Sequence, residues 1–214
     1  MSWTITPPTN PNKSQVEDIK ELEKAIMEAA QEGILMFCSA SDEGAKQDST
    51  FPSKATNKIF KIGGADANGG LYKPVGDINS VDFILPGQLV EGEGLSEGAI
   101  NKVEFWSGSS VATALAAGLA ALILYCAQIR ILRANGAAKD KAKRDFNSLK
   151  QYEKMMKAFK NIGTTNASNG RYLTVWEVFG GKVNESMDRN MGYDSSRQPI
   201  DFIADVAGIL CSKL

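Results

Sequence analysis

The sequence predicts an α/β fold built around a mainly parallel sheet, and two observations support this prediction. A helical pattern over residues 14–33 is followed, after a glycine, by the continuous apolar run at 34–38. Such a run is typical of a parallel strand, because helices cover both faces of these sheets. A helix, a short glycine turn and a buried strand together make half of a right-handed strand–helix–strand unit.

The first helix is predicted to begin at Ser14 and to end at Gly33. Ser14 and Glu17 have the spacing of a capping box, and glycine is the usual residue just after a helix. Apolar residues recur at helical spacing and predict one buried face. These residues are Val16, Ile19, Leu22, Ile26 and Ala29.

Two further buried strands are predicted at 59–63 and 81–85, where short apolar runs lie between polar, glycine-rich segments. The segment 65–70 is predicted to be a turn because it is rich in Gly, Ala, Asp and Asn. Gly63-Gly64 is also interpreted as a turn, and residues 88–102 are predicted to form a loop.

The longest apolar pattern covers residues 111–132 and predicts a core helix, because it is apolar nearly all round and too long for a strand. We predict that it does not cross a membrane, because Thr113, Gln128 and Arg130 interrupt it before a clean span is reached.

The C-terminal part is predicted to be mostly helical. The Lys-rich stretch at 137–145 is predicted to be exposed to solvent. An amphipathic helix is expected around 146–159, and 172–176 is interpreted as a strand or a buried turn. We predict one domain over 1–181 and a tail over 182–214. The tail ends in an amphipathic helix carrying Phe202, Ile203, Val206, Ile209 and Leu210.

The charge balance excludes one class of partner. The chain has 24 Lys and Arg against 25 Asp and Glu, a net charge of −1, whereas a nucleic-acid-binding domain is usually strongly basic. The N-terminal residues 1–13 lack the layout of a signal peptide, so we expect a cytoplasmic protein. Cys38, Cys126 and Cys211 are expected to be buried free thiols, because their number is odd and their spacings are long.

The chain contains no histidine, so it lacks the usual general base and the usual zinc ligand. Its most informative polar residue is Ser110, which lies where the glycine turn Ser107-Gly108 enters the long apolar helix. A helix's first N–H groups have no internal partner, so a serine there is suited to attack a carbonyl and to stabilise the resulting oxyanion. A plain N-cap serine has the same local pattern, and this segment alone favours that simpler interpretation.

The segment 108–118 resembles the nucleophile motif of the subtilisin-like (subtilase) serine peptidases, Gly-Thr-Ser-Met-Ala-Ser-Pro-His-Val-Ala-Gly. The outright matches are Gly108, Ser110, Ala112, Ala117 and Gly118. At Ser109 and Thr113 one hydroxyl residue replaces another. Ala114 and Leu115 depart from the motif.

Upstream matches follow in the order of the family. Residues 33–44 resemble the strand that leads to its Gly-Asn-Glu-Gly loop, and 59–65 and 81–87 resemble Val-Ile-Ala-Val-Gly-Ala and Leu-Asp-Val-Met-Ala-Pro-Gly. Residues 1–4 resemble its Met-Ser-Leu-Gly segment. The likeness covers about residues 1–124, and more weakly 152–180. It implies a three-layer α/β sandwich with a mainly parallel sheet whose N-terminal part is missing.

The resemblance implies roles for individual residues. Ser110 is the catalytic nucleophile and Asp42 falls at the oxyanion-hole position. Ser39, Ala40 and Ser41 would line the substrate pocket, and Ser2, Trp3 and Thr4 would pair with an extended substrate. No organic cofactor or metal side-chain site is expected. The resemblance leaves calcium open, because the family binds it largely through backbone ligands.

Two departures from the family bear on activity. Asp42 replaces the oxyanion asparagine, and an ionised carboxylate would repel the oxyanion, whereas a protonated one could donate; some kexin-like relatives also carry Asp here. The family's Asp and His motifs lie upstream of the segment where this chain begins. In subtilisin itself, loss of the histidine costs on the order of 10⁶ in turnover, so the isolated chain is expected to be inactive.

Two interpretations of function follow. The first is a fragment of an intracellular serine endopeptidase domain whose partners are a peptide substrate and the missing N-terminal part. The second is a non-catalytic, protease-like interaction protein. An exposed sheet edge would favour self-association in either case. Neither nucleic acid nor a membrane is an expected partner.

Overall fold

The computed structural model describes residues 5–44, 51–93, 103–163, 170–180 and 199–211. The chain divides into two compact units. The first, here called the sheet unit, comprises Met1–Ala117 and Thr165–Tyr172, and the second, the helical unit, comprises Gly118–Thr164 and Leu173–Leu214. The predicted domain boundary at residue 181 stays a prediction.

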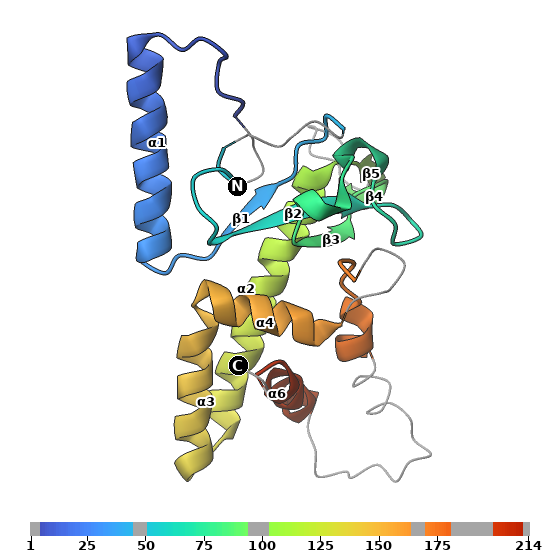
Figure 1. Cartoon of the computed structure of the whole chain (residues 1–214). Coiled ribbons are helices and arrows are strands. Elements are labelled where there is room, and N and C mark those ends of the chain that lie inside the picture. The colour runs from blue at the N-terminus through green and yellow to red at the C-terminus, as the bar shows by residue number, and fades with distance from the viewer. Residues whose placement is uncertain (1–4, 45–50, 94–102, 164–169, 181–198, 212–214) are drawn as a thin grey trace. The chain divides into compact units, whose positions relative to one another are not determined.

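A parallel sheet forms the centre of the sheet unit, as predicted (Figure 1). Its strands are β1 (Met36–Ser39), β2 (Ile59–Ala65) and β3 (Phe83–Pro86), and their order is β1-β2-β3. Ile62 in β2 is paired with Ser39 on one side and with Phe83 on the other. The α/β class is therefore confirmed, and each strand lies within two or three residues of its predicted place.

Helix α1 (Lys13–Gln31) is confirmed, but its predicted cap is wrong. The N-cap is Asn12, whose side chain accepts a hydrogen bond from the Gln15 N–H, while the Gln15 side chain accepts one from the Asn12 N–H, both at 2.9 Å. The amide pair forms the same reciprocal box as Ser and Glu, two residues earlier. Ile26 is buried against β1, and the helix ends at Gln31, two residues before the predicted Gly33, which follows the C-cap Glu32 with a φ of +72°.

The predicted loop at 88–102 is wrong in part, because a hairpin begins inside it. Strand β4 (Val90–Glu93) pairs antiparallel with β5 (Val103–Trp106). Gly92 faces the ring of Trp106, which a Cβ on Gly92 would meet at 3.2 Å. The strands have no run of buried apolar residues, which is why the sequence pattern did not indicate them.

The pair Gly63-Gly64 lies inside β2, so its interpretation as a turn is wrong. Glycine inside a strand often marks a place where another backbone comes close. Gly87, just after β3, is such a neighbour: a Cβ on Gly87 would lie 2.5 Å from the Gly64 Cα.

The predicted turn at 65–70 is confirmed, with the Asp66 carboxylate accepting hydrogen bonds from the N–H groups of Asn68 and Gly70. Two short 3₁₀ turns, Lys73–Val75 and Ile78–Ser80, lead on to β3.

The long apolar helix is confirmed as α2 (Ser109–Arg133), and the boundary between the two units falls within it. The prediction that polar residues interrupt it too early to span a membrane is wrong, since an 18-residue window reaches a mean hydropathy of 2.0. Helix α2 is long and apolar enough to cross a membrane, but the core helices of soluble proteins meet the same criteria of length and composition. One side of α2 is buried, including Ala112, Ala116 and Ile123.

The helical unit contains α3 (Gly136–Leu149), α4 (Tyr152–Ile162) and α6 (Pro199–Leu210), together with helical residues 175–180. The single helix expected around 146–159 is in fact the end of α3 and the start of α4. The strand alternative for 172–176 holds only at its start, since Tyr172 forms a bridge to Ile84 in the sheet unit. The terminal amphipathic helix is confirmed as α6.

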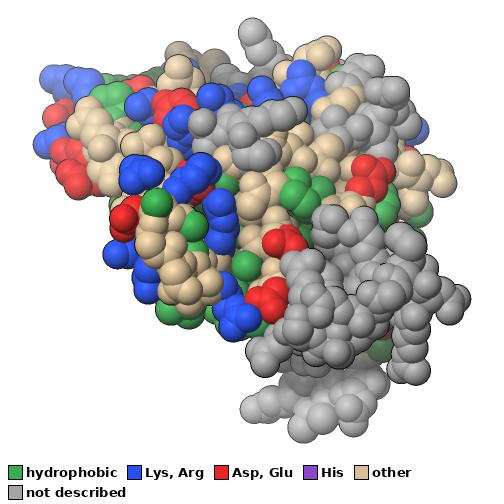
Figure 2. All heavy atoms as spheres, turned by 90° about the horizontal axis from the view of Figure 1, so that it is seen from below, with side chains coloured by type: hydrophobic (Ala, Val, Ile, Leu, Met, Phe, Trp, Pro, Cys, Tyr) green, Lys and Arg blue, Asp and Glu red, His purple; other side chains and the backbone are tan. Residues whose placement is uncertain are grey.

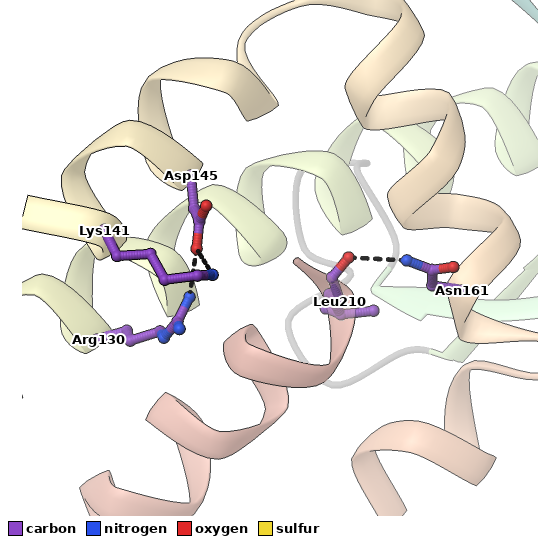
Figure 3. Close-up of polar contacts among 5 residues, drawn as sticks. All are labelled: Arg130, Lys141, Asp145, Asn161 and Leu210. Atoms are coloured by element: carbon purple, nitrogen blue, oxygen red, sulfur yellow. Dashed lines mark hydrogen bonds and ion pairs between the residues drawn. The ribbon is translucent and has the colours of Figure 1, made fainter. Parts of the chain in front are cut away.

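Polar contacts fasten the helices of this unit to one another (Figure 3). The Asp145 carboxylate on α3 forms ion pairs with Arg130 of α2 at 2.8 Å and with Lys141 of α3 at 3.0 Å. The Asn161 side chain on α4 donates a hydrogen bond to the Leu210 carbonyl at the end of α6. Lysine and arginine side chains are prominent on the face seen in Figure 2, and Lys141, Lys143 and Arg144 of α3 are exposed, as predicted for a solvated stretch.

All three cysteines are buried and none of them forms a disulfide, as predicted. Burial and, after it, the neighbouring Asp145 carboxylate raise the pKa of the Cys211 thiol to about 11, although Arg130 and Lys141 lower it. A thiol with a raised pKa stabilises the fold fully below its unfolded pKa, near 9, and this contribution is lost as the pH rises toward 11.

We therefore expect the wild-type chain to lose more stability between pH 8.5 and 11 than a Cys211→Ala variant. Urea unfolding at a series of pH values measures this difference. Identical pH profiles for the two proteins would contradict the expectation, because the variant removes only this titration.

Candidate active site

A tight turn joins β5 to α2 and presents the candidate nucleophile. Gly108 has a φ of +134°, a backbone conformation that other residues rarely adopt, and its N–H donates to the Gly87 carbonyl at 2.8 Å. The Val111 N–H then donates to the Gly108 carbonyl at 3.1 Å. The turn is thus held against the end of β3, and the chain enters α2 directly afterwards.

Ser110 lies in the first turn of α2 with its side chain exposed. Within the described parts of the chain, neither its hydroxyl nor its backbone N–H has a hydrogen-bond partner. The N–H is one of the donors that every helix start leaves unpaired, and it lies at the positive end of the helix dipole. Ser110 therefore combines an accessible hydroxyl with a donor positioned for negative charge.

Ser109, the preceding residue, is completely buried and makes the contacts that Ser110 lacks. Its hydroxyl donates to Asp42 Oδ1 at 2.6 Å and accepts from the Gly64 N–H at 3.0 Å. Its backbone N–H donates to Asp42 Oδ2 at 2.8 Å. Ser109 thereby connects the start of α2 to β2 and to the loop after β1.

Asp42 uses both carboxyl oxygens as acceptors for Ser109. It lies beside the nucleophile, because a Cβ on Gly108 would be 3.3 Å from Asp42 Oδ2 and 3.4 Å from Ser110 Oγ. This placement agrees with a residue at the border of an oxyanion site. The contacts themselves hold the helix start, and the oxyanion role of Asp42 stays a prediction.

The remaining predicted site residues fall in two places. Ser39 ends β1 and is buried, Ala40 is buried and donates its N–H to the Ile62 carbonyl, and Ser41 is half-buried beside Asp42. The structure therefore brings Ser39, Ala40 and Ser41 to the loop that carries Asp42, while their pocket role stays a prediction. Ser2, Trp3 and Thr4 lie outside the described residues.

Three glycines that bring these elements together were not predicted from the sequence as part of the site. Gly64 at the end of β2, Gly87 after β3 and Gly108 before α2 meet at one backbone junction. Glycines at the ends of apolar strands were the available signal. Among the described residues, no cluster of acidic or cysteine side chains is arranged to hold a metal ion.

The family model for the subtilase family of peptidases, Peptidase_S8, matches residues 1–140. The chain belongs to the subtilase family. The subtilase match covers the parallel sheet, the loop with Asp42 and the start of α2 with Ser110, so the resemblance predicted from the motifs is confirmed.

A curated relative of this subtilase chain is an intracellular serine protease from Paenibacillus polymyxa, 32% identical over 111 residues. The match covers 50% of the chain and 32% of the relative, so the chain spans about a third of the relative's length.

Solved structures to which the chain is similar include the prenylagaramide maturation protease PagA, at 18% identity, with a TM-score of 0.49 and coverage of 79% of the chain and 56% of PagA. The PatG macrocyclase in complex with peptide has 12% identity, a TM-score of 0.47 and coverage of 70% and 42%. The patellamide maturation protease PatA has 16% identity, a TM-score of 0.46 and coverage of 76% and 50%.

Proposed function

We propose that this chain supplies the nucleophile-bearing part of a serine endopeptidase site in which Ser110 attacks the peptide carbonyl. The observation that supports this most is the contrast between two adjacent serines. Ser109 is buried and fully engaged, whereas the Ser110 hydroxyl is exposed and has no partner within the described residues. A serine that only capped the helix would use its side chain as Ser109 does.

The proposed chemistry is acyl transfer. Ser110 Oγ bonds to the carbonyl carbon while its proton passes to a base, and the resulting oxyanion accepts a hydrogen bond from the Ser110 N–H. Collapse of this intermediate releases the amine with the transferred proton and leaves an acyl-enzyme, which water hydrolyses. Asp42 borders the oxyanion site and keeps Ser110 in place through Ser109. Ser39, Ala40 and Ser41, with Ser2, Trp3 and Thr4, are proposed to hold the substrate.

The sequence has no histidine, the usual general base for a serine nucleophile, so we propose that the base comes from outside these 214 residues. We propose that a separate segment bearing the Asp and His motifs completes the site, so that the isolated chain is inactive. The name of the Paenibacillus polymyxa relative supports a cytoplasmic location for such an assembly.

Labelling with a fluorophosphonate probe tests this proposal. We expect the isolated chain to remain unlabelled, and to be labelled at Ser110 once a segment with subtilase Asp and His motifs is added. Ser110→Ala, which should fold normally because the residue is exposed, is expected to remain unlabelled in both conditions. Labelling of the isolated chain would contradict its inactivity, and labelling of the complemented Ser110→Ala variant would contradict the role of Ser110.

The second candidate is a non-catalytic interaction protein, which the lack of histidine favours. It predicts that no segment with Asp and His motifs restores labelling. Gel filtration addresses the accompanying proposal of self-association, since a well-behaved monomer would contradict it.

A further inference from the structure

Strands β4 and β5 form a hairpin (Figure 1), and four large apolar side chains in it or next to it are exposed. Clustered apolar side chains on the surface of a soluble protein usually mark a site of interaction. The exposed fractions are 67% for Leu89, 56% for Val103, 62% for Phe105 and 41% for Trp106.

The register of the hairpin separates these residues onto two faces. Directly paired residues share a face, so Phe105 lies opposite Glu91, and Trp106 lies opposite Val90. Trp106 is engaged within the hairpin, since its ring covers Gly92. The other face carries Glu91, Val103 and Phe105, all exposed, and we call these three residues the hairpin face.

Leu89, at the base of the hairpin, is held in a costly conformation. Its φ is +50°, in the left-handed region that residues other than glycine seldom adopt, and its side chain is exposed. The Leu89 N–H donates to Ser107 Oγ at 2.9 Å, which fixes this conformation. Because the leucine side chain is exposed, its burial does not offset the energy of the strained backbone. Strained residues of this kind cluster at binding and active sites.

The hairpin segment is acidic in a chain that is nearly neutral. Between Gln88 and Ser107 there are four glutamates and one lysine, whereas the whole chain has 25 acidic and 24 basic residues. Glu91 on the hairpin face is exposed beside the Phe105 ring. A lysine or arginine side chain fits this pair, because the ring face and the carboxylate both attract a cation.

Both ends of the hairpin are fastened to the turn that presents Ser110. Gly87, two residues before Leu89, accepts the Gly108 N–H, and Ser107, next to the end of β5, accepts the Leu89 N–H. The hairpin face is therefore joined through this turn to the nucleophile Ser110 on α2, which follows the end of β5 by four residues.

We propose that the hairpin face, with Leu89 at its base, docks a stretch of peptide substrate in which a basic side chain is flanked by apolar ones. The peptide's role as a substrate rests on the proposed function. The binding itself does not need a nucleophile. The cation occupies the position between Phe105 and Glu91, and the apolar side chains cover Val103 and Leu89.

The test uses the full chain with Ser110→Ala, which binds without turnover, and three dye-labelled twelve-residue peptides followed by fluorescence anisotropy. One peptide alternates Leu and Arg, the second replaces Arg by Glu, and the third replaces Leu by Ser. We expect saturable binding of the first peptide and an affinity at least tenfold lower for each of the other two. A tenfold loss is on the order of what one buried apolar side chain or one favourable charge contact contributes to binding.

Phe105→Ser is expected to weaken binding of the Leu-Arg peptide about tenfold, and Glu91→Lys about threefold or more. Leu132→Ser and Glu21→Lys are matched controls, because both residues are exposed and lie on α2 and α1. Equal binding of the Leu-Arg and Leu-Glu peptides, or equal losses in the hairpin and control variants, would overturn the proposal. Because Ser110 is absent throughout, these outcomes are independent of the labelling experiment.

Discussion

Gly87→Ala is expected to destabilise the sheet unit by about 3 kcal/mol or more, the upper part of the range for overpacking. The added Cβ would lie 2.5 Å from the Gly64 Cα and 3.1 Å from the Gly108 carbonyl oxygen. Both neighbours are backbone atoms, so no side-chain rotation relieves the clash. Equilibrium urea unfolding, followed by circular dichroism, measures the loss.

Gly118→Ala makes the same chemical change in the opposite context. Gly118 lies inside α2, and a Cβ there would meet nothing within 4 Å. Alanine in a helix interior is expected to stabilise by roughly 0.5–1 kcal/mol. Equal effects of the two substitutions would show that the contact between the three backbone segments at Gly87 is not as tight as described above.

Ser109→Ala is expected to cost about 2–3 kcal/mol, because it leaves the buried Gly64 N–H without an acceptor and Asp42 Oδ1 without its donor. Ser110→Ala, one residue later, is expected to change the free energy of unfolding by less than about 0.5 kcal/mol, as is usual for an exposed residue. Urea unfolding of both variants under identical conditions checks the contrast.

Ser109→Thr provides the control for the hydroxyl, since it keeps the donor and the acceptor at this position. We expect it to retain most of the stability that Ser109→Ala loses. If Ser109→Ala and Ser110→Ala were equally stable, Ser109 would not be the residue that anchors the start of α2.

Much of the fold follows from local sequence patterns. The face of α1 that carries Ile26 and the run that becomes β1 were recognisable because burial on one or both faces imposes a periodicity. Gly33 marked the end of α1 because a positive φ there favours glycine. The family motif identified Ser110 as the candidate nucleophile before any geometry was known.

Other features depend on contacts between residues distant in sequence. Both strands of the hairpin are only four residues long, and no described side chain in them is buried, so the alternation Val103-Glu104-Phe105 was too short to indicate a strand. The contact between Ser109 and Asp42 joins residues 67 positions apart. The cap of α1 was misplaced because Asn12 with Gln15 and Ser14 with Glu17 are chemically equivalent pairs two residues apart. Such competition is decided by the three-dimensional structure.

The burial of all three cysteines has a practical consequence for protein chemistry. With Cys38, Cys126 and Cys211 inside the protein, no native thiol competes for a reagent added from solution. Ser110→Cys would place a single addressable thiol at the start of a helix, where the dipole favours the reactive thiolate. A cysteine at position 110 could therefore be coupled selectively to a spectroscopic probe or to a solid support, with no other substitution in the chain.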